Sequence, residues 1–246
     1  MLRRFTADLH IHTCLSPCGD LQMSPQKIVA QVLRQNIDII AICDHNSAEN
    51  IRPVMKAAEG KSVVVLSGLE VCSREEIHVL AIFDNLESAL GLQTLVYQHL
   101  PGKNDPDAFG LQVVANECDE VVGFQERLLI GATELSIEQV VAEIHGRGGL
   151  AIASHIDREA YSVIGQLGFV PESVKFDALE LSSHMSYENA LVKLPACTWY
   201  TFVKNSDAHF IEDVGKNVSG YLLERPSFQE IVKALRNEDG RRVLTP

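Results

Sequence analysis

Residues 37–45 have the sequence IDIIAICDH, in which an apolar, β-branched run is followed at once by an aspartate and a histidine. Similar runs recur before three other polar groups, Gly68-Leu69-Glu70, Ser154-His155 and Asp207-Ala208-His209. An α/β barrel delivers functional side chains in this way, because its parallel strands end together at one rim. These stretches therefore predict an α/β barrel with a polar site at the ends of its strands.

The length of 246 residues also fits one α/β barrel, and we expect a single domain over residues 1–246. Strand-like runs alternate with helical patterns, which is typical of α/β rather than α+β proteins. Ser24-Pro25 predicts the beginning of one helix, with proline at its first position. Ser136 and Ser227 each begin another helix with the spacing of a capping box.

Residues 101–135 interrupt this alternation. They begin with the turn-forming sequence PGKNDP at 101–106 and continue with an ambiguous stretch that contains two pairs of valines. A long connection inside a compact domain is usually a lid, a binding insertion or a poorly ordered loop. We therefore predict an irregular insertion, which we expect to shape substrate specificity.

The formal net charge of −12 argues against a surface for duplex DNA, which normally shows a basic stripe. A phosphorylated substrate stays open, because bound divalent cations would reverse the potential locally. No apolar stretch reaches the ~20 residues that a membrane helix needs. The start of the chain leaves no room for a signal peptide before Asp8. We expect a cytoplasmic protein without a membrane partner.

The six cysteines are too sparse in a chain of this length to form a disulfide scaffold. Cys14 and Cys18 stand close to the first histidine pair, where they could in principle bind metal. Their spacing matches no common zinc signature. Reduced thiols in a cytosolic protein are therefore the favoured interpretation.

The histidines and carboxylates that end the strands are of the types that bind Zn, Mn or Fe. His10 and His12 are one residue apart, so an extended strand points both to the same face. Asp207 and His209 repeat this spacing. Each group alone has an ordinary explanation, such as surface histidines or a turn at Asp44-His45. Their co-occurrence at several strand ends favours a metal site.

The order of these motifs resembles that of the PHP (polymerase and histidinol phosphatase) family of metal-dependent phosphoesterases. The motifs are Asp8-Leu9-His10-Ile11-His12-Thr13, Asp44-His45-Asn46, Gly68-Leu69-Glu70-Val71, His78, Ser154-His155 and Ser206-Asp207-Ala208-His209. The resemblance spans residues 8–209. It implies a distorted seven-stranded (β/α) barrel that holds two or three divalent metal ions, Mn, Fe or Zn, at its C-terminal rim.

The resemblance further implies nine metal ligands in three sites. In chain order they are His10, His12, Asp20, His45, Glu70, His78, His155, Asp207 and His209. Glu70 would bridge the first two sites, and the third would use Asp20, His45 and His209. Because a competent residue occupies every family position, a degenerate chain without metal is not expected.

Clustered divalent cations generate hydroxide near neutral pH, so we expect hydrolysis of a phosphoester by a metal-activated hydroxide. We expect Asp44 to orient an imidazole, Arg158 to bind phosphate and His184 to act as general acid. Arg158 could instead be a surface arginine that pairs with Asp157 or Glu159.

The expected substrate is a small phosphorylated metabolite or a nucleotide. A nucleotide 3′-phosphate or a short oligoribonucleotide is favoured over histidinol phosphate. One alternative is a non-catalytic, metal-stabilised module that binds a phosphorylated ligand or a protein partner. Another is a metal-dependent amidohydrolase, which usually has a lysine that bridges its metals. Lys204 comes nearest to that position, but its spacing is wrong.

Overall fold

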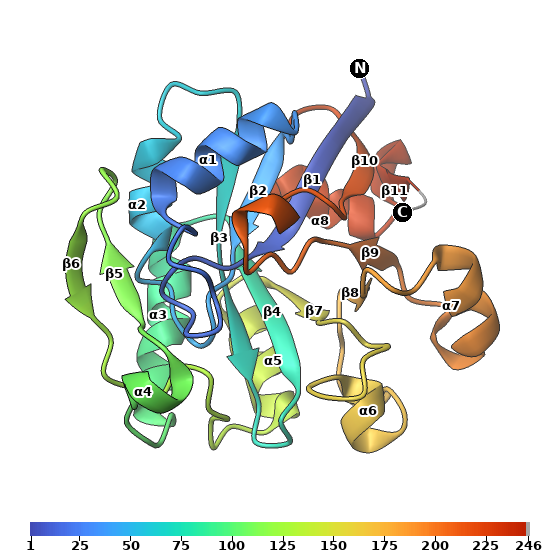
Figure 1. Ribbon diagram of the computed structural model, residues 1–246. Coiled ribbons are helices and arrows are strands. Elements are labelled where there is room, and N and C mark those ends of the chain that lie inside the picture. Colours follow the sequence, from blue (N-terminus) through green and yellow to red (C-terminus); the bar gives the residue numbers. More distant parts are fainter. Residues whose placement is uncertain (245–246) are drawn as a thin grey trace.

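Apolar and β-branched runs form one large sheet in the computed structural model, which describes residues 1–244 (Figure 1). Its strands are β1 (Arg3–Ile11), β2 (Ile39–Ile42), β3 (Val64–Cys72), β4 (His78–Phe83), β7 (Leu150–Ala153), β8 (Ala178–Leu181), β9 (Phe202–Lys204), β10 (Ser219–Leu223) and β11 (Arg242–Leu244). Every residue of β2, β4, β7 and β8 is buried. Strands that are covered on both faces carry such continuous apolar runs.

The sheet has the strand order β11-β10-β1-β2-β3-β4-β7-β8-β9. After β9 the chain returns to the end of β1, where Ala208 and Ile11 form a parallel bridge. Strands β1, β2, β3, β4, β7, β8 and β9 thus form a nearly closed barrel, and β10 and β11 extend the sheet beyond β1. The predicted α/β barrel is confirmed: it has seven strands, and β10 and β11 bring the whole sheet to nine.

One strand of the barrel runs against its neighbours. β4 pairs antiparallel with both β3 and β7, whereas β1, β2 and β3 are parallel, as are β7, β8 and β9. The first residue of β4, His78, consequently lies at the rim where the parallel strands end. This direction explains how a histidine at the start of a strand joins residues that follow the ends of other strands.

Helices connect and cover the strands (Figure 1). They are α1 (Pro25–Arg34), α2 (Ile51–Ala57), α3 (Leu86–Gln98), α4 (Pro106–Phe109), α5 (Ile137–Gly146), α6 (Val163–Leu167), α7 (Tyr187–Lys193) and α8 (Phe228–Leu235). Pro25 occupies the predicted first turn of α1. Among residues 1–244, no helix combines the length and apolar character needed to cross a membrane.

The two predicted capping boxes have different outcomes. Ser136 accepts a hydrogen bond from the Gln139 N–H, and the Gln139 side chain accepts one from the Ser136 N–H, so the first is confirmed. The second is wrong, because the Ser227 side chain caps nothing. The carboxylate of Glu230 binds the Glu224 N–H at 2.7 Å and the Arg241 guanidinium at 3.1 Å instead.

The region predicted to be an irregular insertion contains α4 and a separate hairpin of β5 (Val113–Ala115) and β6 (Val121–Phe124). The hairpin stands at one edge of the molecule beside α2 (Figure 1). Buried Asn50 fastens it there: its side chain donates to the Val113 carbonyl at 3.0 Å and accepts from the Ala115 N–H at 3.1 Å. The insertion therefore packs against the loops that follow β1 and β2.

Gly68 allows the central strands to come together just before Glu70. A Cβ at this position would lie 2.7 Å from Cys43 Sγ and 3.0 Å from the carbonyl oxygens of Ile42 and Ala81. The contact with Cys43 Sγ is shorter than Cβ atoms show in proteins, and the other two are tight contacts with strand backbone, which would have to shift. The glycine of the Gly68-Leu69-Glu70 motif is therefore required by strand packing.

We expect Gly68→Ala to lower the free energy of unfolding by about 1–3 kcal/mol, because a methyl group overpacks a filled site. Chemical denaturation would measure the change. Gly123→Ala on β6 is the matched control, since a Cβ there meets nothing within 4 Å. Equal effects of the two substitutions would contradict this explanation.

Candidate metal centre

Glu70 lies within β3, and its buried carboxylate is surrounded by histidines. Its Oε1 lies 3.3 Å from His10 Nε2, 3.2 Å from His78 Nδ1 and 3.5 Å from His155 Nε2. Its Oε2 lies 3.5 Å from His12 Nε2 and 3.1 Å from His45 Nδ1. Burial raises the pKa of Glu70, but the charges of His78 and His10 hold it well below its ordinary value. The carboxylate is therefore ionised, and it bridges five imidazoles.

His10 is held by a carboxylate that our sequence analysis did not identify. Its Nδ1 lies 3.1 Å from both oxygens of Glu180, which is buried in β8. Glu180 also accepts hydrogen bonds from the His155 N–H at 2.9 Å and the Asn205 side chain at 2.7 Å. A proton on Nδ1 donates to Glu180, so the Nε2 lone pair of His10 points toward Glu70. The only signal in the sequence was a single acid inside an apolar strand.

His12 is oriented through a serine. Its Nδ1 lies 2.9 Å from Ser16 Oγ, and this hydroxyl donates to Asp44 Oδ1 at 2.7 Å. The hydroxyl therefore accepts the Nδ1 proton, which leaves the Nε2 lone pair of His12 free. Asp44 is buried and also accepts from the Thr13 N–H and hydroxyl, each at 2.7 Å. These contacts support the prediction that Asp44 orients an imidazole, with Ser16 between them.

The freed lone pairs of the two histidines converge. His10 Nε2 and His12 Nε2 are 3.0 Å apart, and Asp207 Oδ1 lies 3.3 Å from each. With both Nδ1 protons donated elsewhere, these nitrogens and the oxygens of Asp207 and Glu70 are all acceptors. Acceptors at such separations repel one another unless a proton or a metal cation lies among them.

The charges around this point favour a cation. Burial lowers the pKa of His10, but Glu180, Glu70 and Asp207 raise it well above its ordinary value. Burial, together with the neighbouring His209 and His45, lowers the pKa of His12 well below its ordinary value. Without metal, a proton on His10 therefore relieves the repulsion among these acceptor atoms, and a divalent ion would replace that proton.

Several buried atoms next to Glu70 have no hydrogen-bond partner within residues 1–244. They are Glu70 Oε1, His155 Nδ1 and both ring nitrogens of His78. Buried polar atoms are rarely left without a partner. Imidazole nitrogens and carboxylate oxygens are also the donors that Zn, Mn and Fe accept, so the residues present fit divalent metal ions.

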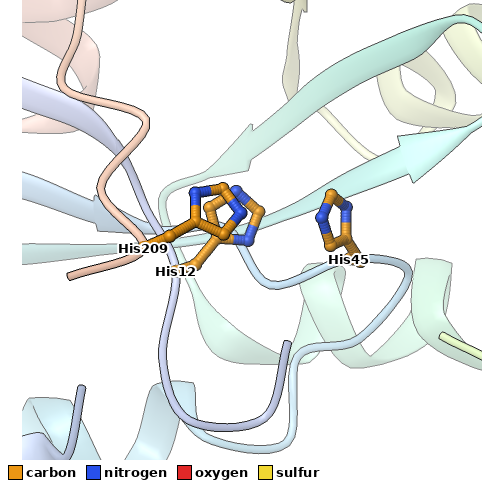
Figure 2. A group of neighbouring side chains, drawn as sticks. All are labelled: His12, His45 and His209. Carbon is orange, nitrogen blue, oxygen red and sulfur yellow. The ribbon is translucent and has the colours of Figure 1, made fainter. Parts of the chain in front are cut away.

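Three groups of side chains bring potential ligand atoms within 4.8 Å of one another: His10-His12-Glu70, His45-Glu70-His78 and His12-His45-His209. Figure 2 shows the last group, which comes from the end of β1 and from the loops after β2 and β9. The ring centroid of His12 lies 4.1 Å from that of His209 and 4.6 Å from that of His45. These groups contain six of the nine predicted ligands; His155 lies 3.5 Å from Glu70 and Asp207 3.3 Å from His10, so eight of the nine lie in one cluster.

The ninth predicted ligand, Asp20, lies in a different place. Its backbone N–H donates to the His209 carbonyl at 2.8 Å, but its carboxylate accepts from the Gln22 N–H at 2.7 Å. Asp20 lines a neighbouring hollow with Lys27 and Phe210. It belongs to none of the three groups of potential ligands.

The two remaining predicted residues lie in different environments. Arg158 lines the hollow above the histidines, and its Nη2 lies 2.8 Å from Asp207 Oδ2. It therefore pairs with Asp207 rather than with Asp157 or Glu159. His184 is exposed and lies outside that hollow. Its proposed role as general acid stays a prediction.

The hollow over the cluster has a volume of about 290 Å³. Apart from the predicted ligands and Arg158, its lining consists of Ile130, Ala160 and Tyr161. The Tyr161 ring stacks on His78 at 4.7 Å and is 41% exposed, so one face is open to a ligand. A larger hollow of about 770 Å³ beside α6 and α7 is lined by none of the histidines.

The chain matches the family model of the PHP domain over residues 8–189. The chain belongs to the PHP family. Its N-terminal motifs fall inside this match, and the structure brings Asp207 and His209, which lie beyond it, into the same cluster.

Two curated proteins are related in sequence. The uncharacterized protein YqxK of Bacillus subtilis is 24% identical over 269 aligned positions, which cover 99% of this chain and 65% of that protein. A 5′-3′ exoribonuclease of Haemophilus influenzae is 28% identical over 78 positions, which cover 30% of this chain and 27% of the enzyme. The chain thus spans less than two thirds of either relative.

Solved structures share the fold. The lesion-specific endonuclease Q of Pyrococcus furiosus superposes with a TM-score of 0.74 at 17% identity, over 98% of this chain and 58% of that one. A candidate metal-dependent phosphoesterase of Bifidobacterium adolescentis gives a TM-score of 0.58 at 18% identity, over 93% and 94% of the two chains.

We expect Glu180→Gln to weaken metal binding by about 10–100-fold, because His10 would lose the carboxylate that orients it. Competition with a chromophoric chelator would measure the affinity. Glu143→Gln is the control, since this half-exposed acid pairs with Arg147 on the surface of α5. Wild-type affinity in the Glu180 variant would show that His10 is positioned by something else.

Proposed function

We propose that the chain is a metal-dependent phosphoesterase that hydrolyses the phosphate ester of a nucleotide or a short oligoribonucleotide. One observation carries this proposal. The Nε2 atoms of His10 and His12 converge with Glu70 and Asp207 at separations of 3.0–3.5 Å, and Arg158 lies beside them. This arrangement places a cation-binding cluster next to a guanidinium, which is a combination suited to a phosphate group.

The residues of the chain prepare this site before any substrate arrives. Glu180 and the Ser16-Asp44 pair fix the orientation of His10 and His12, so their lone pairs need no rearrangement to bind metal. His45, His78, His155 and His209 complete the set that would hold the ions. Bound divalent ions supply Lewis acidity toward phosphate oxygens and activate water for attack.

Arg158 supplies a fixed positive charge at the mouth of the hollow. Its side chain is 42% exposed, and its contact with Asp207 holds the guanidinium over the cluster. A guanidinium offers several N–H donors in one plane and can bind two phosphate oxygens at once. We infer that Arg158 binds the phosphate group of the substrate and orients it over the metal ligands.

The dimensions of the hollow favour a small substrate or a chain end. A volume of about 290 Å³ lies at the low end of ligand pockets. The exposed ring of Tyr161 offers a face on which a base can stack. Ile130 belongs to the insertion, and we infer that this apolar wall contributes to substrate choice.

The comparisons support phosphoesters of nucleic acids as the first substrates to test. One sequence relative is named a 5′-3′ exoribonuclease, and endonuclease Q has been crystallised with duplex DNA that carries an abasic lesion. The net charge of −12 weighs against duplex DNA as substrate of this chain alone. A duplex with an abasic site is therefore the second candidate.

The deciding experiment is a hydrolysis assay with Mn²⁺ or Zn²⁺ on nucleoside bisphosphates, short oligoribonucleotides, histidinol phosphate and an abasic duplex. We expect turnover of the first two classes, and its loss in Asp207→Ala. Asp213→Ala, which removes a surface acid paired with Lys216, should retain full activity. Metal binding without hydrolysis of any substrate would favour a phosphate-binding module instead.

We expect Arg158→Ala to lower kcat/KM by about 10–100-fold, which corresponds to the loss of charged hydrogen bonds of about 1.5–3 kcal/mol. Arg158→Lys should recover only part of the loss, because an ammonium lacks the planar arrangement of donors. Arg74→Ala, on an exposed residue paired with Glu75, is the control. Unchanged kinetics in Arg158→Ala would exclude a role in phosphate binding.

A further inference from the structure

The hollow of about 770 Å³ beside α6 and α7 shares no residue with the hollow over the histidines (Figure 1). Its walls come mainly from segment 168–175, which follows α6, and from segment 193–200, which begins at the end of α7. Both segments lead into the beginnings of strands, whereas most residues of the histidine cluster follow the ends of strands. Tyr200 precedes β9 and Asp207 follows it, so the two places are on the order of 20 Å apart, at about 3.3 Å per residue of extended chain.

The size and the lining of this hollow are those of a ligand site. Sites for small molecules measure about 300–1,000 Å³ and combine apolar or aromatic walls with a few polar groups. The aromatic walls here are Phe169 and Trp199, which are 62% and 65% exposed. The polar side chains of the lining belong to Glu172, Lys175, Lys193 and Tyr200.

Trp199 offers a flat surface that is held in place. Its indole N–H donates to the Ala196 carbonyl at 2.9 Å, which fixes the orientation of the ring. One face of the indole stacks on Tyr200, with 3.7 Å between the ring centroids. Because Trp199 is nevertheless largely exposed, the opposite face is open. Such an aromatic face is a platform on which any nucleic-acid base can stack.

The two lysines give the hollow an excess of positive charge. Lys175 and Lys193 stand against a single acid of the lining, Glu172, and Lys175 binds the backbone carbonyl of Glu172 at 2.7 Å. Four other lysines form ion pairs within residues 1–244, whereas these two form none. In a chain with a net charge of −12, this hollow therefore suits an anion. An ammonium group binds phosphate as a point charge.

Tyr200 adds a polar group that lacks a partner. The residue is 9% exposed, and its buried hydroxyl forms no hydrogen bond within residues 1–244. Burial raises the pKa of this hydroxyl, so it stays protonated and can donate. Buried tyrosine hydroxyls usually have a partner. A ligand in the hollow that Tyr200 lines would supply one.

We propose that this hollow is a second binding site and that it takes a nucleotide. The base stacks on the open face of Trp199, the phosphate group binds Lys175 and Lys193, and the Tyr200 hydroxyl donates to the ligand. The recognised chemistry is a flat base joined to a phosphate group, which a free nucleotide shares with one unit of single-stranded RNA. The site needs no metal, so it does not depend on the proposed phosphoesterase activity.

Trp199 is the one tryptophan of the chain, so its fluorescence reports on this hollow. We expect adenosine monophosphate to quench it saturably in the presence of a chelator. Adenosine should bind about 10–100-fold more weakly, because it lacks the charged group. Inorganic phosphate should compete without quenching, since it has no ring to stack. Unchanged Trp199 emission at every nucleotide concentration up to the millimolar range would overturn the proposal.

Substitution of the exposed lysines tests the charge of the hollow. We expect Lys175→Ala and Lys193→Ala each to weaken the binding of adenosine monophosphate by about tenfold, because each removes a charged contact with phosphate. Lys233→Ala, on α8 and paired with Asp239, is the matched control and should bind as the wild type does. Equal affinities in the three variants would show that these lysines do not hold the ligand.

The length of the ligand distinguishes the two sources of the nucleotide. Quenching by short oligoadenylates should strengthen with length if the hollow holds one unit of a strand, and should stay constant if it holds a free nucleotide. Asp207→Ala should retain the quenching, so failure of the proposed hydrolysis would leave this inference standing. Emission that changes with protein concentration but not with nucleotide would assign the hollow to a second copy of the chain instead.

Discussion

The rim of this barrel depends on one buried negative charge. The carboxylate of Glu70 is 1% exposed and touches imidazoles that come from β1, from β4 and from the loops after β2 and β7. A buried carboxylate is costly unless cations or hydrogen-bond donors compensate it. The compensation here comes from segments far apart in the sequence, so the barrel must close before the charge is stabilised. Gly68 makes this closure possible, since any side chain there would separate β2, β3 and β4.

Three residues of this rim have a left-handed backbone conformation. His155 and Asp207 have φ angles of +29° and +50°, and Asn46, beside His45, has +51°. Such conformations cost about 1–3 kcal/mol each and persist where surrounding contacts hold them. His155 is held by its N–H bond to Glu180, and Asn46 by two bonds from its side chain to the carbonyls of Leu129 and Gly131. The insertion is thus fastened directly to the loop that carries His45, one of the proposed metal ligands.

The residues of the cluster could be predicted from the sequence because most of them follow apolar runs, and because His10 and His12 share the spacing of one strand face. Glu180 could not, since its partner His10 is 170 residues away and the acid itself resembles any residue of β8. The Ser227 capping box failed for a related reason: a local pattern competed with Arg241, which reaches Glu230 through the tertiary fold. Local motifs thus predicted which residues form the cluster, whereas the residues that orient them depend on contacts that only folding creates.

Asp207 lies between the histidine cluster and Arg158, the residue proposed to bind phosphate. Its Oδ1 faces His10 and His12, and its Oδ2 lies 2.8 Å from the Arg158 guanidinium. In the absence of substrate, Arg158 therefore neutralises an oxygen that would otherwise add charge to the cluster. A phosphate group that binds Arg158 competes with Asp207 for the same N–H donors. If Arg158 binds phosphate as proposed, this exchange would return negative charge to the proposed metal ligands, so substrate binding and metal binding would reinforce one another through a single carboxylate.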